Sequence, residues 1–410
     1  MRLKDVTEFC PAYTGATRSD AVAFVPMEAL RYDCITQQEI PFAEARGKYT
    51  FFADGDLLFA KVTPCFENGN IAVATGLKGG IGFGSSEIFV LRAKPGLNNR
   101  YLFYVVQASP FLDGGCATMC GVGGLKRMSP LFPRTFEWEI PSEKAQKEIV
   151  AYLDEKAAAI DARVAVLEKK LAAYRRLKTS VINRAVTRGL DPKAEMKDSG
   201  VDWIGKIPVG WDAVRVESHY DVQLGKMLSA KQSDAREIML EYVCAANVHY
   251  DGVSLNGLKQ MWYLPREVET FRVETGDLLV VEGGAGAGGC SVADNVDRVV
   301  CMQNSILRIR PTSTGSNRFL NFWFNDLGHR GYISYACNVA TIPHFTKEKM
   351  RQTPMPYPPP AEQIAIADYL DAECAKIDKM AELVTREIEL YGKLKRSLIN
   401  EVVTGKRKVA

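Results

Sequence analysis

Residues 141–187 of this chain read PSEKAQKEIVAYLDEKAAAIDARVAVLEKKLAAYRRLKTSVINRAVT, and residues 358–404 read PPPAEQIAIADYLDAECAKIDKMAELVTREIELYGKLKRSLINEVVT. The two segments align without a gap at a shift of 217 residues, with 17 identities in 47 positions. Gln146 matches Gln363, and Tyr174 matches Tyr391. Chance does not produce so many matches in register, and the chain therefore contains an internal repeat.

Each copy of the repeat is predicted to form one long helix. Apolar residues recur at alternating steps of four and three, which is the pattern of a coiled-coil seam. No proline interrupts either copy, whereas Pro141 and Pro358–Pro360 stand just before the helices. Some 44 helical residues at about 1.5 Å each make a rod of roughly 65 Å. The candidate seam and partner-docking positions are Leu153, Ile160, Leu167, Leu171, Tyr174, Leu370, Ile377, Val384, Ile388 and Tyr391.

A seam of this kind needs a partner helix to cover it. The simplest solution buries the two seams against each other, as one coiled coil within the chain. A coil shared between two copies of the chain, or with another protein, is the competing interpretation.

A globular segment precedes each helix, and the two segments share a plan. Both contain a strand signal that opens with the same four residues, Gly55-Asp56-Leu57-Leu58 and Gly276-Asp277-Leu278-Leu279. A second strand and a short helix follow in each segment. We therefore predict a mixed α+β fold, in which two globular domains alternate with two long helices. The predicted regions are 1–140 (globular), 141–190 (helical), 191–212 (a linker rich in Gly and Pro), 213–357 (globular) and 358–410 (helical).

The composition is that of an ordinary globular protein. Of 410 residues, 47% are apolar and 25% charged, and the net charge is +3. No apolar stretch approaches the roughly 18 residues that a membrane span needs, and the first residues are too charged for a secretory signal. The ten cysteines include no C-x-x-C pair, which fits free thiols in a reducing compartment and no metal site. We therefore expect a cytoplasmic protein.

No catalytic constellation is found. All four histidines lie in the second half, so the first half cannot supply a His-based triad. Residues 284–289 read GAGAGG after an apolar strand, but a strand or turn follows where a cofactor loop needs a helix. The sequence MPYPPP at 355–360 lacks the amide that an adenine methyltransferase places before its prolines. We interpret both segments as structural.

Two glycine-containing or polar loops are candidates for contact with nucleic acid, namely 121–127 and 338–344. Lysine and arginine in flexible loops bind phosphates or read guanine, and amide side chains suit adenine edges. The basic stretch of 169–178 suits phosphates or an acidic partner, or is simply a solvated helix face. Ordinary surface polarity is the alternative interpretation for each residue. The candidate DNA-binding residues are Lys61, Lys126, Arg127, Lys226, Asn247, Gln303, Asn304, Thr341 and His344.

Several segments together resemble a specificity subunit of a type I restriction-modification system. The helix entry Ala361-Glu362-Gln363 with Tyr369-Leu370-Asp371, and the helix end 394–405, are similar to the conserved regions of that family. The segment 198–208 (DSGVDWIGKIP) resembles the usual lead into a target-recognition domain, and 63–69 (TPCFENG) resembles a segment of one class of these domains. The first domain departs from the pattern, because it starts at Met1 without its own tryptophan-containing lead-in.

The resemblance implies a non-catalytic subunit that recognises DNA. Each globular domain would be a target-recognition domain for one half of a bipartite double-stranded target. The helices would pair antiparallel, set the distance between the halves and dock two methyltransferase subunits, which restriction-translocase subunits join. The chain itself would need no cofactor, since S-adenosylmethionine, ATP and Mg²⁺ would belong to the partners.

Two functions of other classes compete with this interpretation. One is a coiled-coil scaffold whose domains bind protein, which a salt-dependent DNA affinity would distinguish. The other is a fused methyltransferase or nuclease, against which the missing motifs argue.

Overall fold

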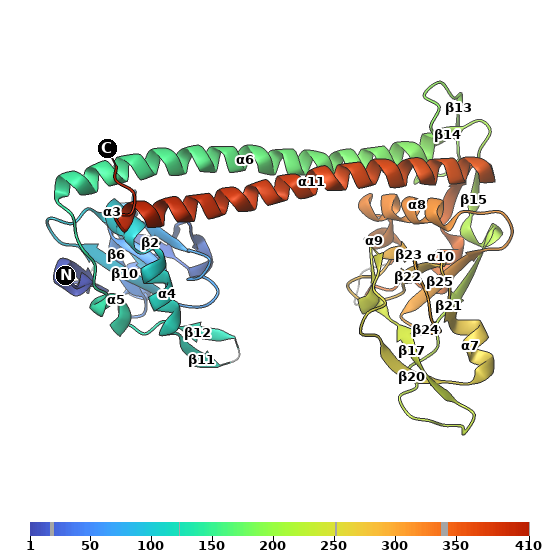
Figure 1. Cartoon of the computed structure of the whole chain (residues 1–410), viewed down its shortest axis with the longest axis horizontal. Helices are drawn as coiled ribbons and strands as arrows, with labels where there is room; N and C mark the ends of the chain where they lie inside the picture. Colours follow the sequence, from blue (N-terminus) through green and yellow to red (C-terminus); the bar gives the residue numbers. More distant parts are fainter. Residues whose placement is uncertain (17–19, 123, 251, 338–342, 410) are drawn as a thin grey trace. The chain divides into compact units, whose positions relative to one another are not determined.

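The computed structural model describes residues 1–16, 20–122, 124–250, 252–337 and 343–409. The chain divides into two compact units, of which the first comprises residues 1–168 with 385–410 and the second residues 169–384. Each unit therefore combines one globular domain with part of both long helices (Figure 1). Within the described ranges, no helix is both long and apolar enough to cross a membrane.

The two long helices are α6 (Glu143–Arg188) and α11 (Pro360–Val403). Both are rich in alanine, glutamate, lysine and leucine, which have high helix propensity. Gly189 follows α6 with φ of +71°, and Gly405 follows α11 with φ of +74°. A residue in the left-handed region commonly ends a helix, and glycine adopts it without steric cost. The predicted mixed fold with two long helices is confirmed.

Within each unit, α6 and α11 run side by side and antiparallel (Figure 1). In the first unit, Asp161 of α6 pairs with Lys395 of α11, and Arg163 pairs with Glu387. The residue numbers thus rise along one helix as they fall along the other. In the second unit, Lys178 of α6 pairs with Asp378 of α11.

The first globular domain contains two four-stranded sheets. The strands of one, in order across the sheet, are β1 (Thr7–Phe9), β10 (Ile88–Ala93), β7 (Leu57–Ala60) and β8 (Ile71–Val73). Those of the other are β5 (Gln38–Pro41), β2 (Ala21–Val25), β9 (Ile81–Gly84) and β6 (Thr50–Ala53). All neighbouring strands are antiparallel except β2 and β9, which are parallel.

The second globular domain repeats this arrangement strand for strand. Its first sheet has the order β16 (Tyr220–Leu224), β25 (Ile306–Pro311), β22 (Leu278–Val281) and β23 (Cys290–Val292). Its second sheet has the order β20 (Lys259–Tyr263), β17 (Ile238–Val243), β24 (Val300–Met302) and β21 (Arg272–Val273). Again one pair, β17 with β24, is parallel and the other neighbours are antiparallel.

Short helices and hairpins complete the two domains. Those of the first are α1 (Leu3–Val6), α2 (Phe42–Ala45), α3 (Asn99–Val105), α4 (Ser109–Ala117), α5 (Leu131–Thr135), and the hairpins β3 (Leu30–Arg31) with β4 (Cys34–Ile35) and β11 (Cys120–Val122) with β12 (Leu125–Arg127). Those of the second are α7 (Pro265–Phe271), α8 (Asn317–His329), α9 (Tyr332–Ala336), α10 (Lys347–Gln352), and the pairs β15 (Asp212–Arg215) with β26 (Pro354–Tyr357) and β18 (Val248–His249) with β19 (Gly252–Val253).

The repeated four-residue motif has a structural reason. Its aspartate, Asp56 or Asp277, is almost fully buried at the start of β7 or β22. Asp56 accepts two hydrogen bonds from the guanidinium of Arg92, at 2.8 and 2.7 Å. Asp277 accepts the same pair from Arg310, at 2.5 and 2.8 Å. A bidentate arginine compensates the cost of burying a carboxylate, so each motif joins two adjacent strands of its sheet.

Each globular domain packs its core against both long helices. In the first unit, Leu153 of α6 and Ile399 of α11 are buried in the same cluster as Phe103 and Phe111. In the second unit, Ile182 of α6 and Leu370 of α11 join the main cluster of the domain. Because burial of apolar area contributes about 25 cal/mol per Å², these contacts make helices and domain one unit.

The segment 191–212, predicted as a linker, is folded. It contains a hairpin of β13 (Met196–Asp198) and β14 (Lys206–Pro208). Ile204, Ile207 and Trp211 are buried in the core of the second unit, and the indole of Trp211 donates to Glu362 of α11 at 2.9 Å. Pro192, Gly200 and Gly210 lie in turns and bends of the segment, while its apolar residues hold it on the domain.

Candidate nucleic-acid interface

A buried glutamine near the start of each long helix ties the helix to its globular domain. Gln146 Oε1 accepts a hydrogen bond from the backbone N–H of Asn98, the N-cap residue of α3, at 2.7 Å. Gln363 Oε1 accepts one from the backbone N–H of Ser316, the N-cap residue of α8, at 3.0 Å. Both glutamines are 0% exposed. Both side chains are hydrogen-bonded inside the protein, which explains why glutamine occurs at this position in both copies of the repeat.

About two turns further along each long helix, the same ion pair recurs. Arg100 of α3 donates to Asp154 of α6 at 2.8 Å, and Arg318 of α8 donates to Asp371 of α11 at 2.8 Å. Asp154 and Asp371 are equivalent in the repeat. Each globular domain is thus held on its helices by equivalent contacts, so the loops of each domain start from equivalent positions relative to those helices.

Three predicted DNA-binding residues of the first domain are close neighbours. Lys126 and Arg127 lie on β12, and both are exposed. Lys61 follows β7, and its carbonyl oxygen accepts from the backbone N–H of Met128 at 2.8 Å. The hydroxyl of Thr63 accepts from the backbone N–H of Lys126 at 2.9 Å, which ties the base of the hairpin to the strand. These bonds bring two lysines and an arginine from separate segments into one cluster.

The guanidinium of Arg127 already has a partner. It donates three hydrogen bonds of 2.9–3.1 Å to the carboxylate of Glu87, and these bonds lower the pKa of Glu87. The Lys61 ammonium lies 5.2 Å from the ring centroid of Phe89, in cation–π contact. Among the three, the ammonium of Lys126 is therefore the most available for a new contact. Arg127 would have to leave Glu87 in order to bind a phosphate or a base.

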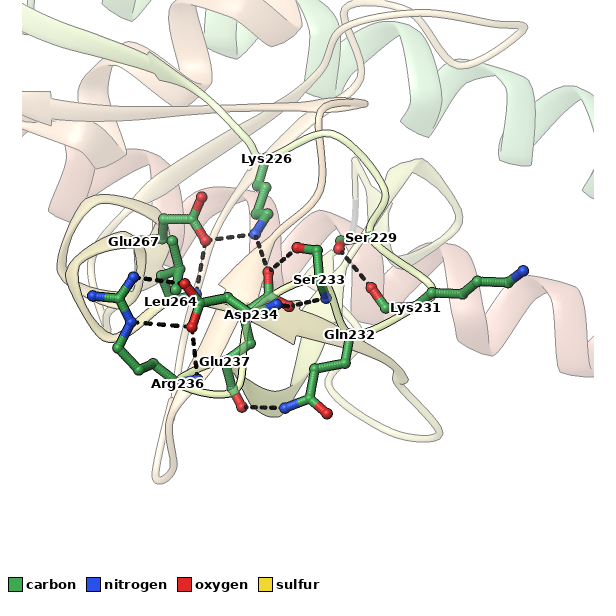
Figure 2. A network of polar contacts seen from close by, with 10 residues as sticks. All are labelled: Lys226, Ser229, Lys231, Gln232, Ser233, Asp234, Arg236, Glu237, Leu264 and Glu267. Carbon is green, nitrogen blue, oxygen red and sulfur yellow. Dashed lines mark hydrogen bonds and ion pairs between the residues drawn. The ribbon is translucent and has the colours of Figure 1, made fainter.

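In the second domain, Lys226 is the centre of an internal network (Figure 2). Only 14% of its side chain is exposed, and its ammonium lies 2.5 Å from Glu267 Oε2 and 3.9 Å from Glu237 Oε1. Glu237 also accepts from the backbone N–H of Ser233 at 2.7 Å, which is the main cause of its lowered pKa. The network holds the loop between β16 and β17 against the start of α7, so in this arrangement the charge of Lys226 is neutralised inside the protein.

The three predicted amides also have internal partners. Asn247 Oδ1 accepts from the backbone N–H and the thiol of Cys244, at 3.0 and 3.2 Å. The amide of Gln303 donates to Asn304 Oδ1, and its carbonyl oxygen accepts from the hydroxyl of Ser305, both at 2.5 Å. All three amides are half-buried. Their bonds shape turns, so they would read bases only through their remaining donors and acceptors.

The second predicted loop is partly described. Thr341 lies outside the described residues. His344 is about half exposed, and its Nδ1 lies 3.2 Å from Glu282 Oε2. Its backbone pairs with that of Gly283, at the start of the loop 283–289, which joins the antiparallel strands β22 and β23. Three other predicted residues of the second domain do lie together, because the backbone of Lys226 pairs with that of Gln303 and its carbonyl oxygen accepts from the backbone N–H of Asn304 at 2.8 Å.

The predicted seam residues fall into three groups according to their burial. Leu153 and Leu370 are fully buried and pack into the cores of the globular domains. Ile160, Leu167, Ile377 and Val384 are 2–9% exposed along the helices. Leu171, Tyr174, Ile388 and Tyr391 are half-buried.

The predicted docking residues did not include a second set of apolar helix positions. Val166 and Leu383 are equivalent in the repeat, and both are exposed, by 56% and 59%. Leu177 and Leu394 are also equivalent, and they are exposed by 48% and 53%. These residues lie outside the heptad seam, and apolar character at equivalent positions of both copies was the signal that could have revealed them.

The comparison with protein families identifies one match. Residues 208–389 match the model described as "Type I restriction modification DNA specificity domain". Over 152 residues, 36% of this chain, the chain is 34% identical to the type I restriction enzyme EcoEI specificity subunit of Escherichia coli and 33% identical to the EcoAI specificity subunit. The matched part spans 26% of the length of each of these relatives. The MjaVIII specificity subunit of Methanocaldococcus jannaschii is 21% identical over 320 residues, 76% of this chain and 71% of the relative.

Solved structures extend the similarity of fold to the whole chain. One chain from a structure concerning complex assembly and conformational transition of the type I R-M system has a TM-score of 0.75 at 16% identity, covering 98% of this chain and 96% of that one. The HsdS subunit from Thermoanaerobacter tengcongensis has a TM-score of 0.52 at 17% identity, covering 98% and 95%.

Proposed function

We propose that this chain is a specificity subunit of a type I restriction-modification system and recognises a bipartite double-stranded DNA sequence, with one globular domain reading each half. The observation that carries the proposal is the duplicated architecture. Two domains of identical strand order are held on the long helices by equivalent glutamine and arginine contacts. Two domains with the same fold but different loop sequences are suited to reading two different half-sites.

Basic and polar loop residues would make the DNA contacts. In the first domain these are Lys61, Lys126 and Arg127, whose charges could meet phosphates or the acceptor edge of guanine. In the second domain they are Lys226, Asn247, Gln303, Asn304, Thr341 and His344. The internal bonds of Arg127 and Lys226 mean that contact with DNA would require an exchange of partners at these two residues.

The paired helices would set the spacing between the half-sites. A helix rises by about 1.5 Å per residue, so its length is fixed by its sequence. The interhelical ion pairs and the buried seam support a rigid pair in each unit. Insertion or deletion of whole turns would be expected to change the spacer that the protein accepts.

The exposed apolar positions support the docking of two methyltransferase subunits. The first unit contributes Val166 and Leu394, and the second contributes their repeat equivalents Leu383 and Leu177. Equivalent surfaces in the two units would bind two copies of one partner. Restriction-translocase subunits would join this core. Catalysis, with S-adenosylmethionine, ATP and Mg²⁺, would belong to these partners, and the assembly would act in the cytoplasm.

Base-resolved mapping of N6-methyladenine tests the function. DNA would be taken from cells that express this chain with the methyltransferase encoded beside it. Methylation confined to one two-part motif with a fixed gap is expected. Methylation that does not change when the chain is deleted would contradict the proposal. Domain assignment follows from exchanging residues 213–357 for those of a relative, which should change one half of the motif only.

A further inference from the structure

The basic stretch of α6 forms one wall of a groove within the second unit. The groove has a volume of about 550 Å³ and lies between α6 and the end of α8. Arg175, Arg176 and Thr179 line it from α6, and His329 lines it from α8. Thr179 lies four residues after Arg175 and three after Arg176, so it is a neighbour of both on the helix surface.

The positive charges of the groove are available to an incoming anion. Arg175 and Arg176 are exposed, and within the described residues neither guanidinium has an ion pair or a side-chain hydrogen bond. His329 is exposed as well, and its ring is stacked beside that of Tyr250, with the centroids 6.5 Å apart. Free arginines are suited to phosphate, because the guanidinium offers several donors in one plane.

The one carboxylate of the groove does not oppose an anion. Asp326 has a fully buried side chain, and both oxygens accept from the amide of Asn183, at 3.0 and 3.1 Å. Arg330 lies 2.9 Å from the same carboxylate. The charge of Asp326 is therefore compensated from inside, and the surface that remains is cationic.

The arginines and the histidine of this groove are not repeated in the first unit. The repeat equivalents of Arg175 and Arg176 in α11 are Gly392 and Lys393. His329 lies 13 residues after Ser316, the N-cap residue of α8. The residue 13 positions after Asn98, the N-cap residue of α3, is Phe111, which is fully buried. The basic groove is thus an asymmetric feature of an otherwise duplicated architecture.

The groove continues into the second domain. Arg175, Thr179 and His329 also line a larger cleft of about 1090 Å³, whose other walls include Gly286 and Gly289. These glycines belong to the loop that starts beside His344. A glycine loop lets a backbone approach closely, because no Cβ intervenes. The cleft is also lined by Asp294, Asp371 and Asp378, of which the last two pair with Arg318 and Lys178. The cationic wall and the loop belong to one continuous surface.

We propose that this groove binds phosphates of the DNA spacer beside the half-site read by the second domain, with Arg175 and Arg176 as the contacting residues. This inference rests on the proposed function and adds a sequence-independent contact on one side only. Free guanidiniums suit phosphodiester oxygens, and continuity with the loop of the second domain favours DNA over an acidic protein.

The test uses the full chain with its methyltransferase subunits and a labelled duplex that carries the mapped target. Anisotropy titrations at several salt concentrations would compare the wild-type chain with R175A/R176A. Each lost phosphate contact should reduce the slope of log K against log salt by about 0.9 and weaken binding roughly five-fold at 0.15 M salt. The loss should be the same for any spacer sequence, because phosphate contacts carry no base information.

The control is K169A/K170A, which removes two charges from the same helix outside the groove and should leave the slope close to that of the wild type. R175K/R176K should recover part of the affinity. Neutral methylphosphonate linkages in the spacer should weaken binding by the wild type but not further weaken R175A/R176A.

An R175A/R176A slope equal to that of the control would overturn the inference. So would normal DNA binding combined with loss of the methyltransferase subunits, which would assign the groove to an acidic protein surface. Absence of specific DNA binding by the wild-type complex would instead contradict the proposed function itself.

Discussion

Lys395 of α11 donates hydrogen bonds to both carboxylate oxygens of Asp161 on α6, each at 2.7 Å. The repeat equivalents form the same pair in the second unit, where Lys178 of α6 donates to Asp378 of α11 at 2.8 and 2.7 Å. The lysine lies on α11 in the first unit and on α6 in the second, and the aspartate lies on the other helix each time, although both keep their positions in the repeat. This is the relation expected when two copies of one helix pair antiparallel.

The two lysines should differ in their contribution to stability. Lys395 is 12% exposed and lies 4.0 Å from the ring centroid of Tyr32, whereas Lys178 is 38% exposed. Lys395→Met should lower the free energy of unfolding by about 1–2 kcal/mol, and Lys178→Met by less than about 1 kcal/mol. Urea denaturation of both variants tests this order. Equal losses would show that the contact with Tyr32 adds nothing.

Charges on the exposed apolar positions should remove methyltransferase subunits one at a time. Val166→Glu with Leu394→Glu alters the first unit, and Leu177→Glu with Leu383→Glu alters the second. Each double variant should bind one subunit instead of two, as measured by mass photometry, since a charge in an apolar contact is costly. Leu131→Glu, at an exposed position of the first domain, is the control and should bind two. Full assembly of both double variants would refute this docking surface.

Loss of the basic cluster in the first domain should affect one half-site. Lys126→Ala with Arg127→Ala should weaken binding, whereas Glu87→Gln should strengthen it a few-fold, because that change frees Arg127 from its ion pair. Competition titrations with duplexes altered in either half of the target test both variants. Equal effects at the two halves, or none, would exclude the hairpin from recognition.

The Lys226 network should make the second unit sensitive to acid. Hydrogen bonds from Ser233 lower the pKa of Glu237, and the hydrogen bond from Lys226 lowers that of Glu267 although burial opposes it. Depressed carboxyl pKa values mean stability that is complete above the ordinary glutamate value of 4.5 and lost as the pH falls below it.

The variant Lys226→Met isolates this effect. It leaves two glutamates without their cation, so it should be clearly less stable than the wild type at pH 7. The difference should shrink between pH 4.5 and pH 3 as the glutamates are protonated. Thermal unfolding across this range is the measurement, and a difference independent of pH would contradict it.

The sequence predicts the long helices and the strands of the repeated motif because their signals are local. Heptad spacing and the absence of proline suffice for α6 and α11, and buried strands such as β7 and β22 are short apolar runs beside a turn. Periodicity also locates the seam. It does not separate Leu153, which enters a domain core, from Leu167, which stays on the helix.

Side-chain partners could not be predicted, because they join residues that are distant in the chain. In the sequence, Lys226 is a lysine in a polar loop and therefore a candidate DNA contact. Only the fold shows that Glu267, 41 residues later, lies beside it. The same holds for Arg127 and Glu87. In 191–212, the density of glycine and proline concealed the three apolar residues that fold the segment onto the domain.

The division of the chain into units affects how the protein is made. The second unit is one continuous stretch, residues 169–384, whereas the first needs residues 385–410 as well as residues 1–168. The first globular domain is synthesised before the second, but its surroundings are completed only after the second domain has been made. Until residues 385–403 have left the ribosome, Phe103 and its neighbours lack the cover of Ile399 and Val402. The nascent first domain consequently exposes part of its core throughout synthesis of the second, which is the period when premature termination or a chaperone would act on it.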